Sequence, residues 1–209
     1  MLFPRITNMN TNLTQTPPYT LRPATLEDAF EIWSVMDISC KAMEQKEHFI
    51  CDDLDYVKNI LSGHGFGVVA CDTDGKIVGN LLVKYPGLKE DNLGYDVFTA
   101  ANETSVDSPI SPASQHRNHT IVLCAETLMR VLHMDSASVL PEHRGHHLEK
   151  RMIHYAETLI DTSKYSYALA TVAPENFASL KSLQRNGYQI WAVKEKYGGL
   201  VRCVMLKKL

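Results

Sequence analysis

The fold of this chain is decided by the segment Ser138-Val139-Leu140-Pro141-Glu142-His143-Arg144-Gly145-His146-His147-Leu148-Glu149-Lys150. The apolar run before Pro141 predicts a β-strand, and the residues after the turn predict a helix. A turn that leads into a helix leaves backbone N–H groups without partners beside the positive end of the helix dipole. The segment therefore predicts a site for a phosphate or pyrophosphate. Two positions where glycine would let the backbone approach the anion hold His147 and Glu149.

Length and composition indicate a soluble globular protein. The chain has 209 residues, 44% of them hydrophobic and 22% charged, which is enough for one domain with a substantial core. The formal net charge of -3 gives no reason to expect nucleic-acid binding, and no apolar run approaches the roughly 18 residues of a membrane span. The five cysteines are scattered and include no C-x-x-C pair, which favours a reducing cytosol over a disulfide framework. We therefore expect a cytoplasmic protein that binds neither nucleic acid nor membranes.

The order of predicted elements favours a sheet covered by helices. Strands are expected at residues 19–22, 66–71, 76–85, 131–140, 165–172, 189–194 and 200–207. Helices are expected at residues 25–43, 53–61, 148–162 and 175–186, the first of them capped by Thr25. A hairpin followed by a β-α-β unit gives a mixed sheet with helices on both faces.

The chain is expected to form a single domain over residues 19–209, preceded by a polar, flexible tail at residues 1–18. Residues 86–130 differ from the rest and read as an insertion, because most of them are polar and prolines interrupt them. Within the polar part of the insertion, residues 93–98 have the pattern of an ordered element. The acids of this insertion could attract a cationic substrate, although acids on a solvated loop are the more common case.

Three segments resemble the signatures of the GNAT N-acetyltransferases. Val139-Leu140-Pro141-Glu142-His143-Arg144-Gly145 resembles the acetyl-CoA segment of that family, which commonly reads V-x-P-E-x-R-G-x-G-x-G/A. Asn176-Phe177-Ala178-Ser179-Leu180 with Asn186-Gly187-Tyr188 resembles the next signature, and Leu21-Arg22-Pro23-Ala24-Thr25-Leu26-Glu27-Asp28 resembles a family opening. The resemblance covers about residues 19–85 and 131–209. It implies an α+β fold with α/β/α layers, in which the central mixed sheet is mostly antiparallel.

The resemblance also implies acetyl-CoA as cosubstrate. The strand at residues 133–140 would splay from its neighbour and expose its backbone to the pantetheine arm, and the turn at residues 144–149 would hold the pyrophosphate. The implied cofactor-binding residues are Ser138, Val139, Leu140, Arg144, Gly145, His146, His147, Leu148, Glu149, Asn176 and Ser179. His147 and Glu149 depart from the family's small residues, and a carboxylate repels a pyrophosphate. Either these side chains turn outward and cofactor binding is weakened, or the cofactor site is impaired.

Four histidines lie close together in the sequence: His143, His146, His147 and His154. Zinc sites usually add cysteine or acidic ligands in a closed geometry. Because His143 precedes the turn and His154 lies two helical turns beyond His147, they do not converge, and we expect no metal.

Candidates for proton transfer lie on the strand before the turn. Strand alternation places His133, Asp135, Ala137 and Val139 on one face. Asp135 is a candidate general base or a ligand for a cationic substrate, with a structural carboxylate as the alternative. His133 is a second candidate base, with a core or surface histidine as the alternative. By resemblance, the backbone N–H of Val139 or its neighbour would stabilise the oxyanion.

The departing thiolate needs a proton or a hydrogen bond. Many relatives use a tyrosine seven residues after the motif asparagine, and this chain has Leu183 there. Ser182 is adjacent and is the candidate for this role, with four tyrosines as unplaced alternatives: Tyr165, Tyr167, Tyr188 and Tyr197.

Together, these features predict a cytoplasmic GNAT-type N-acetyltransferase that moves an acetyl group from acetyl-CoA to a primary amine. No cysteine occupies a motif position, so direct attack in a ternary complex is expected. The alternative is a catalytically impaired GNAT-fold module that binds acyl-CoA or regulates a partner, which His147, Glu149 and Leu183 favour. The acceptor is expected to be the amine of a small molecule or peptide. The last strand is expected to be exposed, so pairing with a second copy as a homodimer stays open.

Overall fold

The computed structural model describes residues 19–45, 50–88, 92–98 and 124–209. The tail predicted for residues 1–18 lies outside these residues, as does most of the insertion predicted for residues 86–130. The described parts of that insertion contain two short helices, α3 (Gly94–Val97) and α4 (Ala125–Leu128). The ordered element predicted for residues 93–98 is therefore confirmed.

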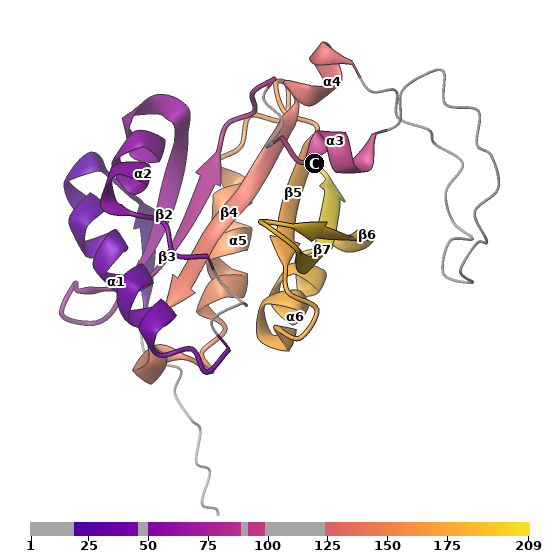
Figure 1. Ribbon diagram of the computed structural model, residues 1–209. Helices are drawn as coiled ribbons and strands as arrows, with labels where there is room; N and C mark the ends of the chain where they lie inside the picture. The colour runs from indigo at the N-terminus through magenta and orange to yellow at the C-terminus, as the bar shows by residue number, and fades with distance from the viewer. Residues whose placement is uncertain (1–18, 46–49, 89–91, 99–123) are drawn as a thin grey trace, which may run out of the picture.

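A seven-stranded sheet forms the centre of the molecule (Figure 1). Its strands are β1 (Thr20–Pro23), β2 (Gly65–Cys71), β3 (Ile77–Lys84), β4 (Val131–Val139), β5 (Tyr167–Val172), β6 (Gln189–Lys196) and β7 (Leu200–Lys208). They lie in the order β1-β2-β3-β4-β5-β7-β6, and β4 and β5 are the parallel pair of an otherwise antiparallel sheet. The mostly antiparallel sheet of an α+β fold is thus confirmed.

Helices cover both faces of this sheet (Figure 1). One face carries α1 (Ala29–Lys41) and α2 (Leu54–Asn59), while α5 (Leu148–Thr158) packs against β2, β3 and β4 from the other, beside α6 (Phe177–Arg185). The central strand β3 is therefore buried along most of its length. A continuous apolar strand of this kind is typical of a sheet covered on both sides. The predicted α/β/α layers are confirmed.

The connection from β1 to α1 is closed by its own side chains. The carboxylate of Asp28 accepts two hydrogen bonds from the Arg22 guanidinium, at 2.7 and 2.8 Å. The same carboxylate accepts the backbone N–H of Thr25 at 2.7 Å, which completes the predicted helix cap. The hydrogen bonds from Arg22 lower the pKa of the Asp28 carboxyl to about 2.

Two expectations about this fold are wrong. The last strand, β7, lies between β5 and β6, so the edge strand at this end of the sheet is β6 rather than the last strand. Cys40 and Cys51 form a disulfide, with their Cα atoms 6.4 Å apart, although the cysteine spacing favoured none. The end of α1 and the segment before α2 approach each other, and an approach of this kind cannot be read from sequence spacing.

Candidate active site

The parallel strands β4 and β5 separate along their length. They pair over residues 131–133 of β4 and residues 167–169 of β5, whereas β4 continues to Val139 and β5 to Val172. Beyond the last pair the two strands border a cleft of about 540 Å³. The splay that the family resemblance implied is present, and the cleft lies at the carboxyl ends of both strands, where ligands of such sheets usually bind.

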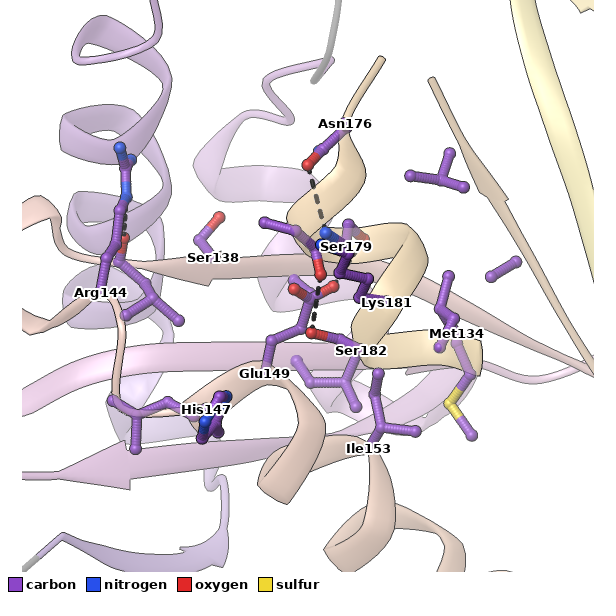
Figure 2. A pocket seen from close by; sticks show the side chains of 18 of the residues that line it. Met134, Ser138, Arg144, His147, Glu149, Ile153, Asn176, Ser179, Lys181 and Ser182 are labelled. Carbon is purple, nitrogen blue, oxygen red and sulfur yellow. Dashed lines mark hydrogen bonds between the residues drawn. The ribbon is translucent and has the colours of Figure 1, made fainter. Parts of the chain in front are cut away.

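The cleft brings together most of the predicted site residues (Figure 2). It is lined mainly by β4, β5, the turn before α5, α5 itself, α6 and the end of α1. The predicted residues that line it are Asp135, Ser138, Val139, Arg144, Gly145, His147, Leu148, Glu149, Asn176, Ser179 and Ser182.

The turn before α5 presents its backbone to the cleft. Gly145 has a φ of 85°, and a Cβ there would meet open space, so conformation rather than packing favours glycine. His147 is the N-cap of α5, adopts a left-handed conformation with a φ of 56°, and makes no side-chain capping bond. His147 therefore leaves the first N–H groups of α5 without a side-chain cap. Uncapped N–H groups of this kind are what an anion binds at a helix start.

Arg144 lines the cleft, but its guanidinium contacts backbone carbonyl groups. Its Nε donates to the carbonyl oxygen of Val139 at 3.3 Å, and its Nη2 donates to that of Ser39 at 3.5 Å. In Figure 2 the side chain extends away from Glu149 on the other side of the cleft. The predicted contact with a phosphate therefore requires the exposed Arg144 side chain to rotate.

Glu149 points into the protein rather than out to solvent. Its Oε1 accepts a hydrogen bond from the Ser179 hydroxyl at 2.6 Å, which joins the start of α5 to the start of α6 (Figure 2). Burial raises the pKa of the Glu149 carboxyl, and hydrogen bonds from Ser179 and Ser182 lower it in part. Ser179 is also held by Asn176, whose Oδ1 accepts its backbone N–H at 3.2 Å. Of the two alternatives for Glu149, the outward side chain is contradicted.

Two residues expected to bind the cofactor are not among the described residues that line the cleft. Leu140 belongs to the main core and is 2% exposed. The ring of His146 lies 5.5 Å from that of Tyr19, next to His143, whose Nδ1 is hydrogen-bonded to the Tyr19 hydroxyl at 2.8 Å. The geometry supports neither residue as a side-chain ligand. Leu140 packs in the apolar core, and the ring of His146 lies against Tyr19, just before β1.

A β-bulge changes the faces of β4. Leu81 pairs with Ala137 and Val83 pairs with Met134, so β4 has one residue more than β3 between these pairs. An extra residue breaks the alternation of side chains. The strict alternation predicted for this strand is therefore wrong at Asp135, because Asp135 and the preceding Met134 both line the cleft.

Asp135 has partners that sequence reasoning missed. Its carboxylate accepts a hydrogen bond from the hydroxyl of Tyr56 on α2. The neighbouring Ser136 donates to Oδ2 of Asp52 at 2.5 Å, and burial raises the pKa of this Asp52 carboxyl. The two pairs join residues 79 and 84 positions apart, so no local pattern could have found them.

His133 is buried away from the described lining of the cleft. It is 6% exposed, and its Nε2 accepts the backbone N–H of Leu93 at 3.2 Å. The same nitrogen lies 3.4 Å from Oδ1 of Asn92. This arrangement matches the core histidine that was the alternative, and the geometry does not support His133 as the base.

Two candidates for protonating the thiolate lie at the cleft or beside it, on α6 and at the β6–β7 turn. Ser182 lines the cleft and its hydroxyl donates to the carbonyl oxygen of Ala178 at 3.0 Å. Leu183 is 3% exposed and packs in the core. Among the four alternative tyrosines, Tyr197 is hydrogen-bonded to a cleft residue, since its hydroxyl lies 2.9 Å from Oγ1 of Thr171.

The backbone of β4 also fits the predicted oxyanion donor. The N–H of Leu140 donates to the carbonyl oxygen of Val78 on β3 at 2.9 Å. Successive N–H groups of a strand point to opposite sides, so the N–H of Val139 points away from β3 and toward the splay. The carbonyl of Val139 points the same way and accepts the Ser39 hydroxyl at 3.1 Å.

Comparison with known proteins identifies the fold. No protein-family model matches the sequence, and no curated protein matches it. Solved structures do match the chain: the GNAT-family acetyltransferase of Streptococcus pneumoniae has a TM-score of 0.60 at 13% identity, covering 91% of this chain and 99% of that chain. The chain has the GNAT fold.

Two further solved structures share the GNAT fold. The phosphinothricin acetyltransferase of Sinorhizobium meliloti, in complex with acetyl-CoA, has a TM-score of 0.60 at 15% identity, covering 91% of this chain and 88% of that chain. The ribosomal-protein-S18-alanine N-acetyltransferase of Escherichia coli has a TM-score of 0.59 at 8% identity, covering 91% and 93%. Within the described residues of the GNAT fold, no cluster of three or more His, Cys, Asp or Glu side chains is arranged to hold a metal ion. No described helix is long and apolar enough to cross a membrane.

Proposed function

We propose that this chain is an N-acetyltransferase that moves an acetyl group from acetyl-CoA to a primary amine by direct attack in a ternary complex. The observation that carries the proposal is the splay of β4 from β5 beside the uncapped start of α5. An unpaired strand edge offers N–H and C=O groups to the amides of pantetheine, and a helix start attracts pyrophosphate. The Sinorhizobium meliloti structure with this fold contains acetyl-CoA, which supports the same cosubstrate here.

The reaction needs one acyl transfer and two proton movements. The neutral amine nitrogen attacks the thioester carbonyl carbon, the C–S bond breaks, and an amide forms. Asp135 takes the proton lost by the nitrogen, directly or through water, and Ser182 donates a hydrogen bond to the departing thiolate, which takes a proton from solvent. The N–H of Val139 stabilises the oxyanion of the tetrahedral intermediate.

Direct attack is favoured over an acyl-enzyme because no cysteine lines the described part of the cleft. The acceptor is the amine of a small molecule or peptide. A cytoplasmic location is part of the proposal, and the disulfide between Cys40 and Cys51 counts against it, since cytosolic thiols are normally kept reduced.

The alternative function is a GNAT-fold module that binds acyl-CoA or regulates a partner without catalysis. The specific observations that favour it are the carboxylate of Glu149, which faces the cleft at the start of α5, and Leu183 in place of the family tyrosine. A module of either kind would transfer no acetyl group.

A thermal-shift titration with acetyl-CoA, followed by thiol release across a panel of amines, separates these functions. We expect a rise in melting temperature, because a ligand of the folded state stabilises it by mass action. No shift at millimolar acetyl-CoA contradicts the enzyme and a module that binds acyl-CoA. A shift without thiol release favours that module. Asp135→Asn is expected to lower kcat/KM by about 10²–10⁴-fold without reducing the thermal shift. The exposed Asp55 of α2 provides the matched control, and Asp55→Asn is expected to leave both unchanged.

A further inference from the structure

Glu149 occupies the part of the cleft that an anionic ligand would need. It is the second residue of α5, one position after the buried Leu148, and it lines the cleft. Its carboxylate is bound across the cleft by the hydroxyl of Ser179 at 2.6 Å. Because the start of a helix attracts negative charge, an ionised Glu149 already supplies the anion that this position favours.

The surroundings of Glu149 provide hydroxyl groups and no paired cation. The charged and titratable side chains that also line the cleft are Asp135 of β4, His143, Arg144 and His147 of the turn, and Lys181 and Arg185 of α6. In the described part of the chain none of them forms an ion pair or hydrogen bond with Glu149. On α5 itself Lys150 and Arg151 follow, and Arg151 donates to the carbonyl oxygen of Tyr19 at 2.9 Å. The α1 and β5 residues of the lining are uncharged.

Ser179 donates two hydrogen bonds to other residues of the protein. Its N–H donates to Oδ1 of Asn176, which caps α6, and its hydroxyl donates to Glu149. A phosphate at the start of α5 would meet this carboxylate at close range, and two anions in a partly buried site repel each other. A neutral carboxyl group instead offers one O–H donor to a phosphate oxygen.

From this geometry we propose that Glu149 sets the affinity for acyl-CoA, and that the cofactor binds when the Glu149 carboxylate takes up a proton from solvent. The inference rests on the proposed function, because it concerns the cosubstrate of the same cleft. Burial already raises the pKa of Glu149, so the proton needed for binding is taken up at a smaller free-energy cost than by an exposed glutamate.

The direction of the pH dependence follows from this proton. Below the pKa of Glu149 the carboxyl is already neutral, so this group makes no contribution to the pH dependence of acyl-CoA affinity. Above that pKa each binding event must first protonate Glu149, so affinity falls and approaches about a tenfold loss per pH unit. A neutral side chain at position 149 removes this loss.

The test is calorimetric titration of acetyl-CoA into the full chain and into Glu149→Gln between pH 5.5 and 9, with each point repeated in two buffers of different ionisation enthalpy. We expect affinity of the unmodified chain to fall with pH, with proton uptake on binding, and Glu149→Gln to bind more tightly at high pH with a flatter profile. Titrations of the cofactor phosphate and of the histidines are common to both proteins and cancel in the comparison. Glu142→Gln is the matched control, because Glu142 is an exposed acid of the same turn outside the cleft lining, and its profile should match the unmodified chain.

The outcomes separate this inference from the proposed function. Equal pH profiles for the unmodified chain and Glu149→Gln, or weaker binding by the variant at high pH, overturn the role of Glu149 and leave the proposed function standing. If Glu149→Gln binds acetyl-CoA and the unmodified chain does not, the inference is supported. No binding by either protein at any pH overturns both. Should Glu149→Gln fail to fold, Glu149→Ala takes its place, and proton uptake by the unmodified chain is decisive: none at high pH overturns the inference.

Discussion

Two strand-to-helix connections of this molecule share a local design and differ in what occupies the helix start. Between β1 and α1, the carboxylate of Asp28 is held by the Arg22 guanidinium and the N–H of Thr25. Between β4 and α5, the carboxylate of Glu149 is held by a hydroxyl group and faces a cleft, and the N-cap His147 makes no side-chain capping bond. The first connection is complete within the protein, whereas the second leaves a place for a ligand.

The pKa values of Asp28 and Glu149 shift in opposite directions, in line with this difference in their partners. Hydrogen bonds from Arg22 lower that of Asp28 to about 2, while burial raises that of Glu149. A carboxylate paired with a cation stabilises the fold as an anion, whereas a carboxylate buried without a cation is favoured in its neutral form. The comparison teaches that a helix start with an acid in its first turn is structural or functional according to the partner of that acid.

The largest effect is expected from the apolar anchors of the two connections. Leu148 begins α5 and is 2% exposed, whereas Leu26 begins the short 3-10 helix Leu26–Asp28 before α1 and is 50% exposed. Leu148→Ala should lower the free energy of unfolding by about 2–5 kcal/mol, because it leaves a cavity in the core. Leu26→Ala, the matched control, should change it by less than about 0.5 kcal/mol. Urea denaturation of both variants measures this, and equal effects would show that the two connections are anchored alike.

A smaller effect is expected from the closed connection. Asp28→Asn should lower the free energy of unfolding at neutral pH by about 1–2 kcal/mol, because it breaks a partly exposed ion pair that also caps a helix. Since the folded pKa is about 2 against an ordinary 3.8, this stabilisation is present above about pH 4 and is lost as pH falls toward 2.

Denaturation of both proteins from pH 2 to 7 measures that difference. Asp37→Asn is the control, because Asp37 forms an exposed pair with Lys41, and less than about 0.5 kcal/mol is expected there. A gap between Asp28→Asn and the unmodified chain that persists at pH 2 would refute the assignment.

The smallest effect is expected at the open connection. His147→Gly should raise the free energy of unfolding by about 0.5–1 kcal/mol, because glycine adopts the left-handed conformation without the penalty of a Cβ. Affinity for acetyl-CoA should stay equal or rise. The neighbouring His146 has no positive φ, so His146→Gly should destabilise the protein instead. Thermal unfolding of both variants measures these changes in stability. A change of the same sign in the two variants would contradict the prediction.

Much of the fold followed from local pattern. The capped start at Thr25, the apolar strands and the strand-to-helix segment before α5 each depend on residues a few positions apart, and the structure contains them. The order of elements, read with the resemblance to a family, was enough to predict the layers. The edge of the sheet was predicted wrongly, because the position of β7 depends on its pairing with β5 rather than on its own residues.

In the candidate site, too, local motifs predicted some features, while others depend on long-range packing. The positions of Arg144, Gly145 and Ser179 beside the cleft were predicted from motifs. The inward side chain of Glu149 was left open, because its direction depends on packing between α5 and α6. The faces of β4 were predicted wrongly, since the bulge at Asp135 arises from register with β3.

The sequence by itself determined the turn and the start of α5, because the hydrogen-bonding needs of a turn and a helix start are settled within one short segment. The splay of β4 from β5 was implied by the family resemblance, and only the tertiary structure decided that it begins after three paired residues. Only the tertiary structure decided that Ser179 meets Glu149 and that Tyr56 meets Asp135. These contacts join distant parts of the chain, and they form because packing of helices on the sheet brings those parts together.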